Sequence, residues 1–173
     1  MHVFLTGPIQ IGKSTIIKKV TDTLGLKTGG FVTFFQNREC ERRTLHLSPA
    51  GLLTQPSADN VVAMFSEDGL QIFPERFDTL GVLNIRRARE NSELIIMDEC
   101  GRFESKALAF QAEIFNSLDG RTPILGVLKE GDIPWLSRIK RHPNVCVITV
   151  SEENRDVLPA SVAEMLGPGA SLS

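Results

Sequence analysis

Two hydrophobic periodicities alternate along most of this chain. Continuous apolar runs, which are typical of strands buried on both faces of a sheet, cover residues 2–6, 94–99, 123–128 and 144–150. Between them apolar residues recur every three to four positions, which predicts helices over 14–24, 74–90, 105–118, 135–141 and 153–166. This alternation favours an α/β fold, with a mainly parallel central sheet covered by helices on both faces.

The segment from 29 to 73 departs from the alternation. Residues 29–35 and 44–47 have the composition of strands and are separated by a polar turn, so they predict a β-hairpin. Two further short strands are predicted at 61–65 and 70–73. The intervening residues 48–59 are rich in proline, glycine, serine and aspartate, and we expect an irregular, mobile loop there.

Length and charge narrow the class of protein. The 173 residues suffice for one domain with a sizeable core, and we expect a single domain over 1–173 with a frayed tail from about 167. A net charge of -2 without a long basic run argues against nucleic acid as an obligatory partner. The short basic clusters at 86–89 and 138–141 are interpreted as solvated helix faces.

Cysteine usage and hydropathy point to a cytoplasmic protein. The three cysteines lack any C-x-x-C pairing, so they indicate neither a disulfide framework nor a zinc site, and a reducing compartment is expected. No apolar stretch approaches the roughly 20 residues of a membrane span, so we expect no membrane partner. A protein partner is not predictable from the sequence.

The first apolar run leads into a phosphate-binding (Walker A) motif, G-x-x-x-x-G-K-[ST]. The residues expected to bind nucleotide are Gly7, Pro8, Ile9, Gln10, Ile11, Gly12, Lys13, Ser14 and Thr15. A tight turn from a strand into a helix aims backbone N–H groups and the positive helix end at one point, where phosphates bind. Lys13 would reach the β- and γ-phosphates, and the Ser14 hydroxyl would bind Mg²⁺, the expected cofactor. The motif therefore predicts nucleoside triphosphates as partners.

A second apolar run ends in two carboxylates, Asp98 and Glu99, in the manner of a Walker B strand. In open α/β sheets ligands bind at the carboxyl ends of the strands, so this pair and the Gly7 loop belong to one edge. We assign Asp98 to magnesium and Glu99 to the attacking water. Cys100 is expected to pack behind the metal site. A group that orients water favours hydrolysis, whereas a kinase must exclude water and present an acceptor hydroxyl.

Supporting roles fall to residues whose segments approach the strand ends. The arginines there are Arg102, Arg121, Arg138, Arg141 and Arg155. Arg102, four residues after Asp98, is the first choice for neutralising charge on the transferred phosphoryl group. Asn154 and Arg155 are candidates for contacts to the base, with helix capping by this segment as the alternative. Trp135 has two readings, stacking on a base or capping the sheet edge, and the second is favoured.

Together these residues resemble the THEP1-type nucleoside-triphosphatases, also called cancer-related nucleoside-triphosphatases in animals. The resemblance runs nearly end to end and rests on segments 2–8 leading into 12–15, 30–33, 98–104 and 153–156. It implies a P-loop, three-layer αβα fold of the RecA/ASCE kind, with a strand inserted between the two phosphate motifs. It also implies Mg²⁺-dependent hydrolysis of ATP, GTP and other nucleoside triphosphates to diphosphates, with little base preference.

Three departures from the family pattern are informative. Gln10 stands where the family usually has another loop glycine, so the loop geometry or affinity is altered if that position needs a positive φ. Arg102 replaces the usual lysine, which keeps the charge but changes the donor geometry. Residues 35–38 differ from the family's Glu-Val-Arg stretch, and the Arg-x-Gly-Phe element that follows it is not recognisable.

Two other functions remain open from the residues alone. In a nucleoside or nucleotide kinase, the segment 48–59 would close as a lid over an acceptor, and transfer would exceed hydrolysis. In a nucleotide-dependent switch, turnover would be very slow and a partner protein would bind only one nucleotide state. Hydrolysis is the leading hypothesis because Glu99 is a suitable group for orienting water.

Overall fold

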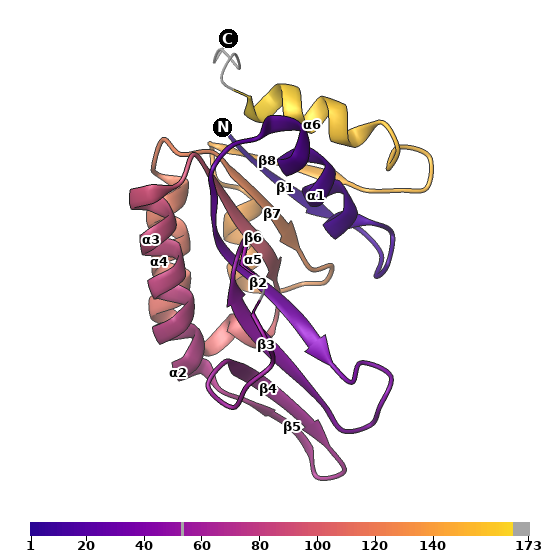
Figure 1. Ribbon diagram of the computed structural model, residues 1–173, viewed down its shortest axis with the longest axis vertical. Helices are drawn as coiled ribbons and strands as arrows, with labels where there is room; N and C mark the ends of the chain where they lie inside the picture. The colour runs from indigo at the N-terminus through magenta and orange to yellow at the C-terminus, as the bar shows by residue number, and fades with distance from the viewer. Residues whose placement is uncertain (53, 168–173) are drawn as a thin grey trace.

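The computed structural model describes residues 1–52 and 54–167, in which eight strands form one sheet in the order β5-β4-β3-β2-β6-β7-β1-β8 (Figure 1). The strands are β1 His2–Thr6, β2 Thr28–Gln36, β3 Arg43–Pro49, β4 Val61–Ser66, β5 Gly69–Ile72, β6 Leu94–Cys100, β7 Ile124–Leu128 and β8 Val145–Thr149. Strands β2, β6, β7, β1 and β8 run parallel, whereas β3, β4 and β5 extend the sheet in antiparallel fashion. The predicted α/β fold is confirmed, and β7 is the expected strand between β1 and β6.

Helices cover both faces of the parallel strands. They are α1 Lys13–Leu24, α2 Pro74–Arg76, α3 Val82–Asn91, α4 Leu108–Leu118, α5 Pro134–Lys140 and α6 Leu158–Leu166. Helices α1 and α6 lie together on one face, and α3, α4 and α5 lie on the other (Figure 1). Successive side chains of β1 point to opposite faces of the sheet. Val3 and Leu5 pack with α1 and α6, whereas Phe4 packs in the core under α3, α4 and α5.

Three predicted helices have different bounds in the structure. The helix predicted over 74–90 is present, but its middle is a π-turn at Phe77–Gly81. The one predicted from 105 begins at Leu108, after a 3₁₀ turn at Phe103–Lys106. The last begins at Leu158 instead of 153, since proline is accommodated only in the first helical turn and Pro159 would otherwise lie in the helix interior.

The segment 48–59 is more ordered at its ends than predicted. Ser48 and Pro49 belong to β3, which pairs with β2 in the predicted hairpin. At the far end the backbone N–H of Leu47 donates to the Asn60 carbonyl, and His46 Nδ1 lies 2.7 Å from Asn60 Oδ1. These bonds are long-range, so the local composition does not predict them. The expectation of a frayed tail concerns 168–173, which lie outside the described residues.

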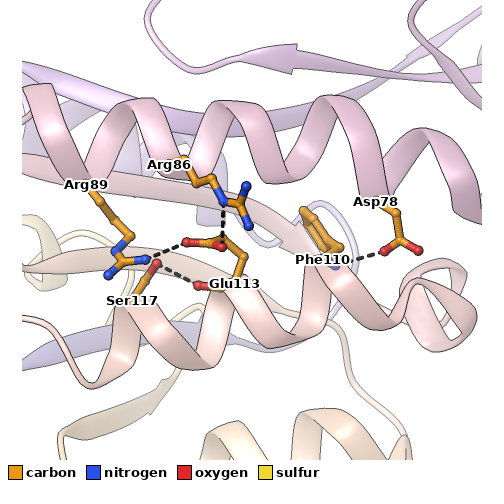
Figure 2. Close-up of polar contacts among 6 residues, drawn as sticks. All are labelled: Asp78, Arg86, Arg89, Phe110, Glu113 and Ser117. Carbon is orange, nitrogen blue, oxygen red and sulfur yellow. Dashed lines mark hydrogen bonds and ion pairs between the residues drawn. The ribbon is translucent and has the colours of Figure 1, made fainter.

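Helices α3 and α4 are joined by charged groups (Figure 2). The Arg86 Nε donates to Glu113 at 2.9 Å, and Arg89 donates to the other carboxylate oxygen. The Glu113 side chain is only 4% exposed, whereas both arginines reach solvent. At the start of α4 the Phe110 backbone N–H donates to Asp78. The cluster at 86–89 is therefore not simply a solvated face, since two of its arginines hold α4. Among residues 1–52 and 54–167, no helix is long and apolar enough to cross a membrane.

Candidate active site

The phosphate loop connects β1 to α1 at the carboxyl edge of the sheet. Gly7 has φ 134°, and a Cβ built on it would lie 2.6 Å from the Val150 carbonyl oxygen. Only glycine fits that position, because other residues would combine an unfavourable φ with a backbone clash. Gly12, with φ 112°, is the last residue before α1. The loop thus presents the N-terminus of α1 at the place where the motif predicts phosphates.

Gln10 lies in the left-handed region with φ 65°. The position where the family usually has glycine does therefore need a positive φ in this fold. A side chain in that conformation costs on the order of 1–2 kcal/mol relative to glycine. This cost falls on the stability of the loop.

The Lys13 ammonium is folded against its own loop. Its Nζ donates to the carbonyl oxygens of Gly7 and Pro8, at 2.6 and 2.7 Å. Partial burial lowers the pKa of Lys13, and the negative charge of Glu99 opposes that effect. An ammonium group has three N–H donors, so one remains for a phosphate oxygen before either carbonyl bond is exchanged.

Ser14 and Asp98 meet between the two motifs. Burial raises the pKa of Asp98 to about 6, and a hydrogen bond from the Ser14 hydroxyl partly opposes the rise. A hydroxyl and a carboxylate are oxygen ligands of the kind that Mg²⁺ prefers, and Mg²⁺ usually fills its other positions with water and substrate phosphates. The donor set fits that ion. Within the described part of the chain, no cluster of three or more histidine, cysteine or acidic side chains could hold a metal by itself.

Glu99 follows at the end of β6, where the Asp98–Glu99 peptide bond is cis. One Glu99 carboxylate oxygen lies 3.4 Å from the Lys129 ammonium. Lys129 is the residue directly after β7, the strand between β6 and β1. Sequence reasoning missed it, although it comes at the end of an apolar run, as Asp98 and Glu99 do, and that rule would have found it.

The turn after Glu99 is fixed through the peptide groups of Gly101. The Glu104 carboxylate accepts from the Gly101 N–H at 2.8 Å, and the Trp135 indole donates to the Gly101 carbonyl at 2.9 Å. Complete burial raises the pKa of Glu104 to about 7. Trp135 is buried under this turn, so stacking on a base is wrong for it. Cys100 is fully buried in the core behind the carboxylates, as expected.

The other predicted site residues, Arg102, Asn154 and Arg155, lie at the edge of the candidate site. The exposed Arg102 guanidinium lies 5.3 Å from the Phe103 ring centroid, and within residues 1–52 and 54–167 it forms no ion pair with Asp98 or Glu99. The Asn154 side chain accepts from the Ser151 N–H and donates to the Thr149 carbonyl, so it shapes the loop after β8. Arg155 is exposed on that loop, which passes Gly7 at Val150.

A hollow of about 550 Å³ lies elsewhere, at the tips of β2–β5. Strand β2 continues to Gln36, four residues beyond the Val32 that pairs with Asp98. None of the predicted site residues lines the hollow. The phosphate loop and the β6 carboxylates, which carry the chemical groups, identify the candidate site instead.

Comparison with known proteins agrees with this geometry. The model of a family described as NTPase matches residues 2–163. The chain belongs to the NTPase family. Relatives include the nucleoside-triphosphatase THEP1 of Methanocaldococcus jannaschii, 28% identical over 91% of this chain and 92% of the relative, and that of Methanosarcina barkeri, 29% identical over 94% and 95%.

Solved structures of the same kind share the fold of this NTPase family member. The crystal structure of THEP1 from the hyperthermophile Aquifex aeolicus superposes with a TM-score of 0.77 at 22% identity, covering 96% of this chain and 99% of that one. The solution structure of a human cancer-related nucleoside triphosphatase gives 0.73 at 21% identity, covering 98% and 99%. The resemblance expected from the motifs is confirmed.

Proposed function

We propose that this protein is a Mg²⁺-dependent nucleoside-triphosphatase that converts ATP, GTP and other nucleoside triphosphates to the diphosphate and phosphate. The observation that carries the proposal is that the phosphate loop after β1 and the carboxylates Asp98 and Glu99 near the end of β6 lie at the same edge of the sheet, on either side of the inserted strand β7. Relatives over nearly the whole chain are named nucleoside-triphosphatases, which supports hydrolysis as the reaction.

Each site residue is assigned to phosphate binding, metal binding or activation of water. The backbone N–H groups of residues 7–15, apart from Pro8, and the Lys13 ammonium bind the phosphates. Ser14 and Asp98 would hold Mg²⁺, which supplies charge neutralisation at the phosphate oxygens. Glu99 orients a water molecule and accepts its proton as the water oxygen bonds to the γ-phosphorus. The bond from that phosphorus to the β-phosphate oxygen breaks, and the nucleoside diphosphate leaves.

The loop after β8 is the proposed neighbour of the base. Asn154 holds this loop through two backbone hydrogen bonds, and the exposed Arg155 is the side chain that would contact the base. A single exposed arginine tolerates different bases, which supports a broad substrate range. Arg155→Ala should therefore change the relative KM values for ATP, GTP, CTP and UTP while leaving kcat within about threefold, an order-of-magnitude expectation for lost ground-state binding.

Phosphate release tests the proposal directly. The purified protein is incubated with Mg²⁺ and each of ATP, GTP, CTP and UTP, with and without a mixture of nucleosides and nucleoside monophosphates. Release from several triphosphates without an acceptor, abolished by EDTA and restored by Mg²⁺, is expected. Consumption of nucleotide only when an acceptor is present would establish a kinase and remove Glu99 from its role.

Two variants separate binding from chemistry. Lys13→Ala should weaken triphosphate binding and abolish hydrolysis, because the phosphates lose their point charge. Glu99→Gln should abolish hydrolysis while sparing binding, since the amide cannot accept a proton from water. Lys19→Ala, an exposed lysine on α1, is the matched control and should behave as the unmodified protein. Unchanged turnover in Glu99→Gln would eliminate the assigned mechanism.

The kinase alternative gains no support from the segment 48–59. Its two ends are tied to β3 by the Leu47–Asn60 backbone bond and the His46–Asn60 contact. The Asn60 side chain also accepts from the Ser57 N–H and donates to the Gln55 carbonyl. Among the described residues, those from 55 to 60 are therefore held by bonds to one another, which gives closure as a lid no support.

A further inference from the structure

The Lys129 side chain lies inside the candidate site, and the mechanism above does not use it. Its ammonium is 3.4 Å from Glu99, and both side chains are about one-third exposed, at 38% and 34%. The pair is thus open to a ligand instead of being sealed in the core. A surface ion pair of this exposure contributes little to stability, on the order of 0–1 kcal/mol. Stability alone therefore gives a weak reason for this placement.

The base of the Lys129 side chain is held firmly, and its ammonium lies beside Glu99. Its backbone N–H donates to the Cys100 carbonyl at 2.9 Å, which fixes the residue beside the end of β6. The aliphatic stem packs on Gly101, where a Cβ would lie 3.4 Å from Lys129 Cδ. Gly101 is itself held by Glu104 and Trp135. The bond to Cys100 and the packing on Gly101 therefore aim the ammonium at the catalytic edge.

Lys129 also lies within electrostatic range of the phosphate loop. The charges that act on Lys13 come from Glu99, Glu130, Lys129 and Asp98. Arg102, the arginine favoured by sequence reasoning, is absent from this set and stacks beside Phe103 instead. Of the described cations, Lys13 and Lys129 are the two placed among the site carboxylates. Lys13 binds the loop carbonyls and is assigned to the β- and γ-phosphates. Lys129 is therefore the cation available to the γ-phosphate during its transfer.

We propose that Lys129 is a catalytic residue that contacts the γ-phosphate and neutralises the charge developing on it during hydrolysis. This inference rests on the proposed function. On triphosphate binding, the ammonium exchanges its Glu99 partner for a γ-phosphate oxygen. The Glu99 carboxylate is then free to accept the proton of the attacking water, and the bonds formed and broken are those already stated. A cation supplied within the chain performs the task that an arginine from a partner performs in other phosphate-loop hydrolases.

The test compares Lys129→Met, which keeps the length of the stem, with Lys129→Arg, which keeps the charge. Lys129→Met should lower kcat by about 10²–10³-fold, the range for loss of one preorganised charge-stabilising group. Lys129→Arg should recover part of that loss. Lys19→Met, the same substitution on the exposed face of α1, should leave kcat unchanged. Thermal unfolding verifies that each variant is folded.

Binding provides a readout that is independent of turnover. The affinity for a non-hydrolysable ATP analogue is measured against that for ADP, and also for ADP with aluminium fluoride, which mimics the transferred phosphoryl group. Lys129→Met should lose about tenfold or more of the preference for the analogue and for the fluoride complex, with ADP affinity unchanged. A preference equal to that of the unmodified protein would overturn the γ-phosphate contact, even if kcat falls, because Lys129 would then act only through Glu99.

The outcomes separate this inference from the proposed function. If the unmodified protein releases phosphate from none of the four triphosphates, the proposed function fails. The affinity ratio still decides the role of Lys129 in that case. If the unmodified protein hydrolyses several triphosphates and Lys129→Met matches it in both kcat and affinity ratio, hydrolysis stands and the inference is wrong.

Discussion

Two carboxylates in this molecule, the buried Glu113 and the half-buried Asp98, have opposite surroundings. Burial would raise the pKa of Glu113 on α4, but hydrogen bonds and charges from Arg86 and Arg89 together lower it (Figure 2). Burial raises the pKa of Asp98 to about 6, with only the Ser14 hydroxyl and the Lys13 charge opposing it. The first carboxylate has its cations built into the fold. No cation of the described part of the chain forms an ion pair with the second, Asp98.

The difference separates a structural carboxylate from a functional one. Glu113 ties two helices together, and its charge is neutralised within the chain. The charge of Asp98 remains available for an ion that comes with the substrate, and such unpaired, shifted groups concentrate at functional sites. Glu104 resembles Asp98, because it is buried at the same edge without a directly bound cation. Substitutions at these carboxylates should therefore affect either turnover or stability.

Asp98→Asn should lower phosphate release by about 10²–10³-fold without lowering stability. The amide cannot supply the anionic ligand that the metal requires, whereas it needs less solvation than a buried carboxylate. Phosphate release and urea unfolding at pH 8 measure the two effects. Unchanged turnover in Asp98→Asn would mean that Asp98 has a structural role like that of Glu113 and no role in hydrolysis.

The pH dependence of stability should identify Glu104 as a carboxylate without a cation partner. Its pKa is raised from 4.5 to about 7 in the folded protein, so the unfolded chain releases the proton first. Protonated Glu104 therefore makes its full contribution to the free energy of unfolding below pH 4.5. That contribution, about 3 kcal/mol, is lost as the pH rises to about 7.

Glu104→Gln removes this dependence while keeping an oxygen for the Gly101 N–H. The free energy of unfolding of the variant, relative to the unmodified protein, should therefore increase by about 3 kcal/mol between pH 4 and pH 8. Urea titrations at several pH values measure the difference. A constant difference over this range would mean that Glu104 is charged or neutral to the same extent in both states.

Glu113→Gln should lower stability and leave turnover unchanged, the opposite of the result expected for Asp98→Asn. Two charge-assisted hydrogen bonds become neutral or are lost, which lowers the free energy of unfolding by about 2 kcal/mol. Phosphate release at 25 °C should stay unchanged, since α3 and α4 lie away from the phosphate loop (Figure 1). Loss of turnover in a folded Glu113→Gln protein would show that the helix pair is coupled to the site.

Gln10→Gly should give the smallest effect. Glycine relieves the positive φ, but it also gains entropy in the unfolded chain, so stability should rise by only about 0.5–1 kcal/mol. Asn37→Gly is the matched control, because Asn37 has φ 54° and asparagine tolerates this region better. An equal gain at both positions would mean that the phosphate loop carries no particular strain at Gln10.

Local patterns were sufficient for much of the molecule. The strands at β1, β6, β7 and β8, the hairpin and the two phosphate-site motifs were all predicted, because each depends on residues close together in the chain. The chemical types at Lys13, Ser14, Asp98 and Glu99 then follow from the motifs. The helix boundaries at Leu108 and Leu158 were missed, since proline placement and the anchoring of the 3₁₀ turn override helical periodicity.

The α/β fold, the NTPase family, the phosphate loop and the pair of strand-end carboxylates can all be predicted from the amino-acid sequence. The groups that surround the pair depend on how distant segments pack against one another. Lys129 reaches Glu99, Trp135 reaches Gly101, and Glu113 reaches two arginines because strand order and helix packing bring distant segments together. Hydrophobic periodicity specifies which face of an element is buried, but it does not specify which neighbour covers that face.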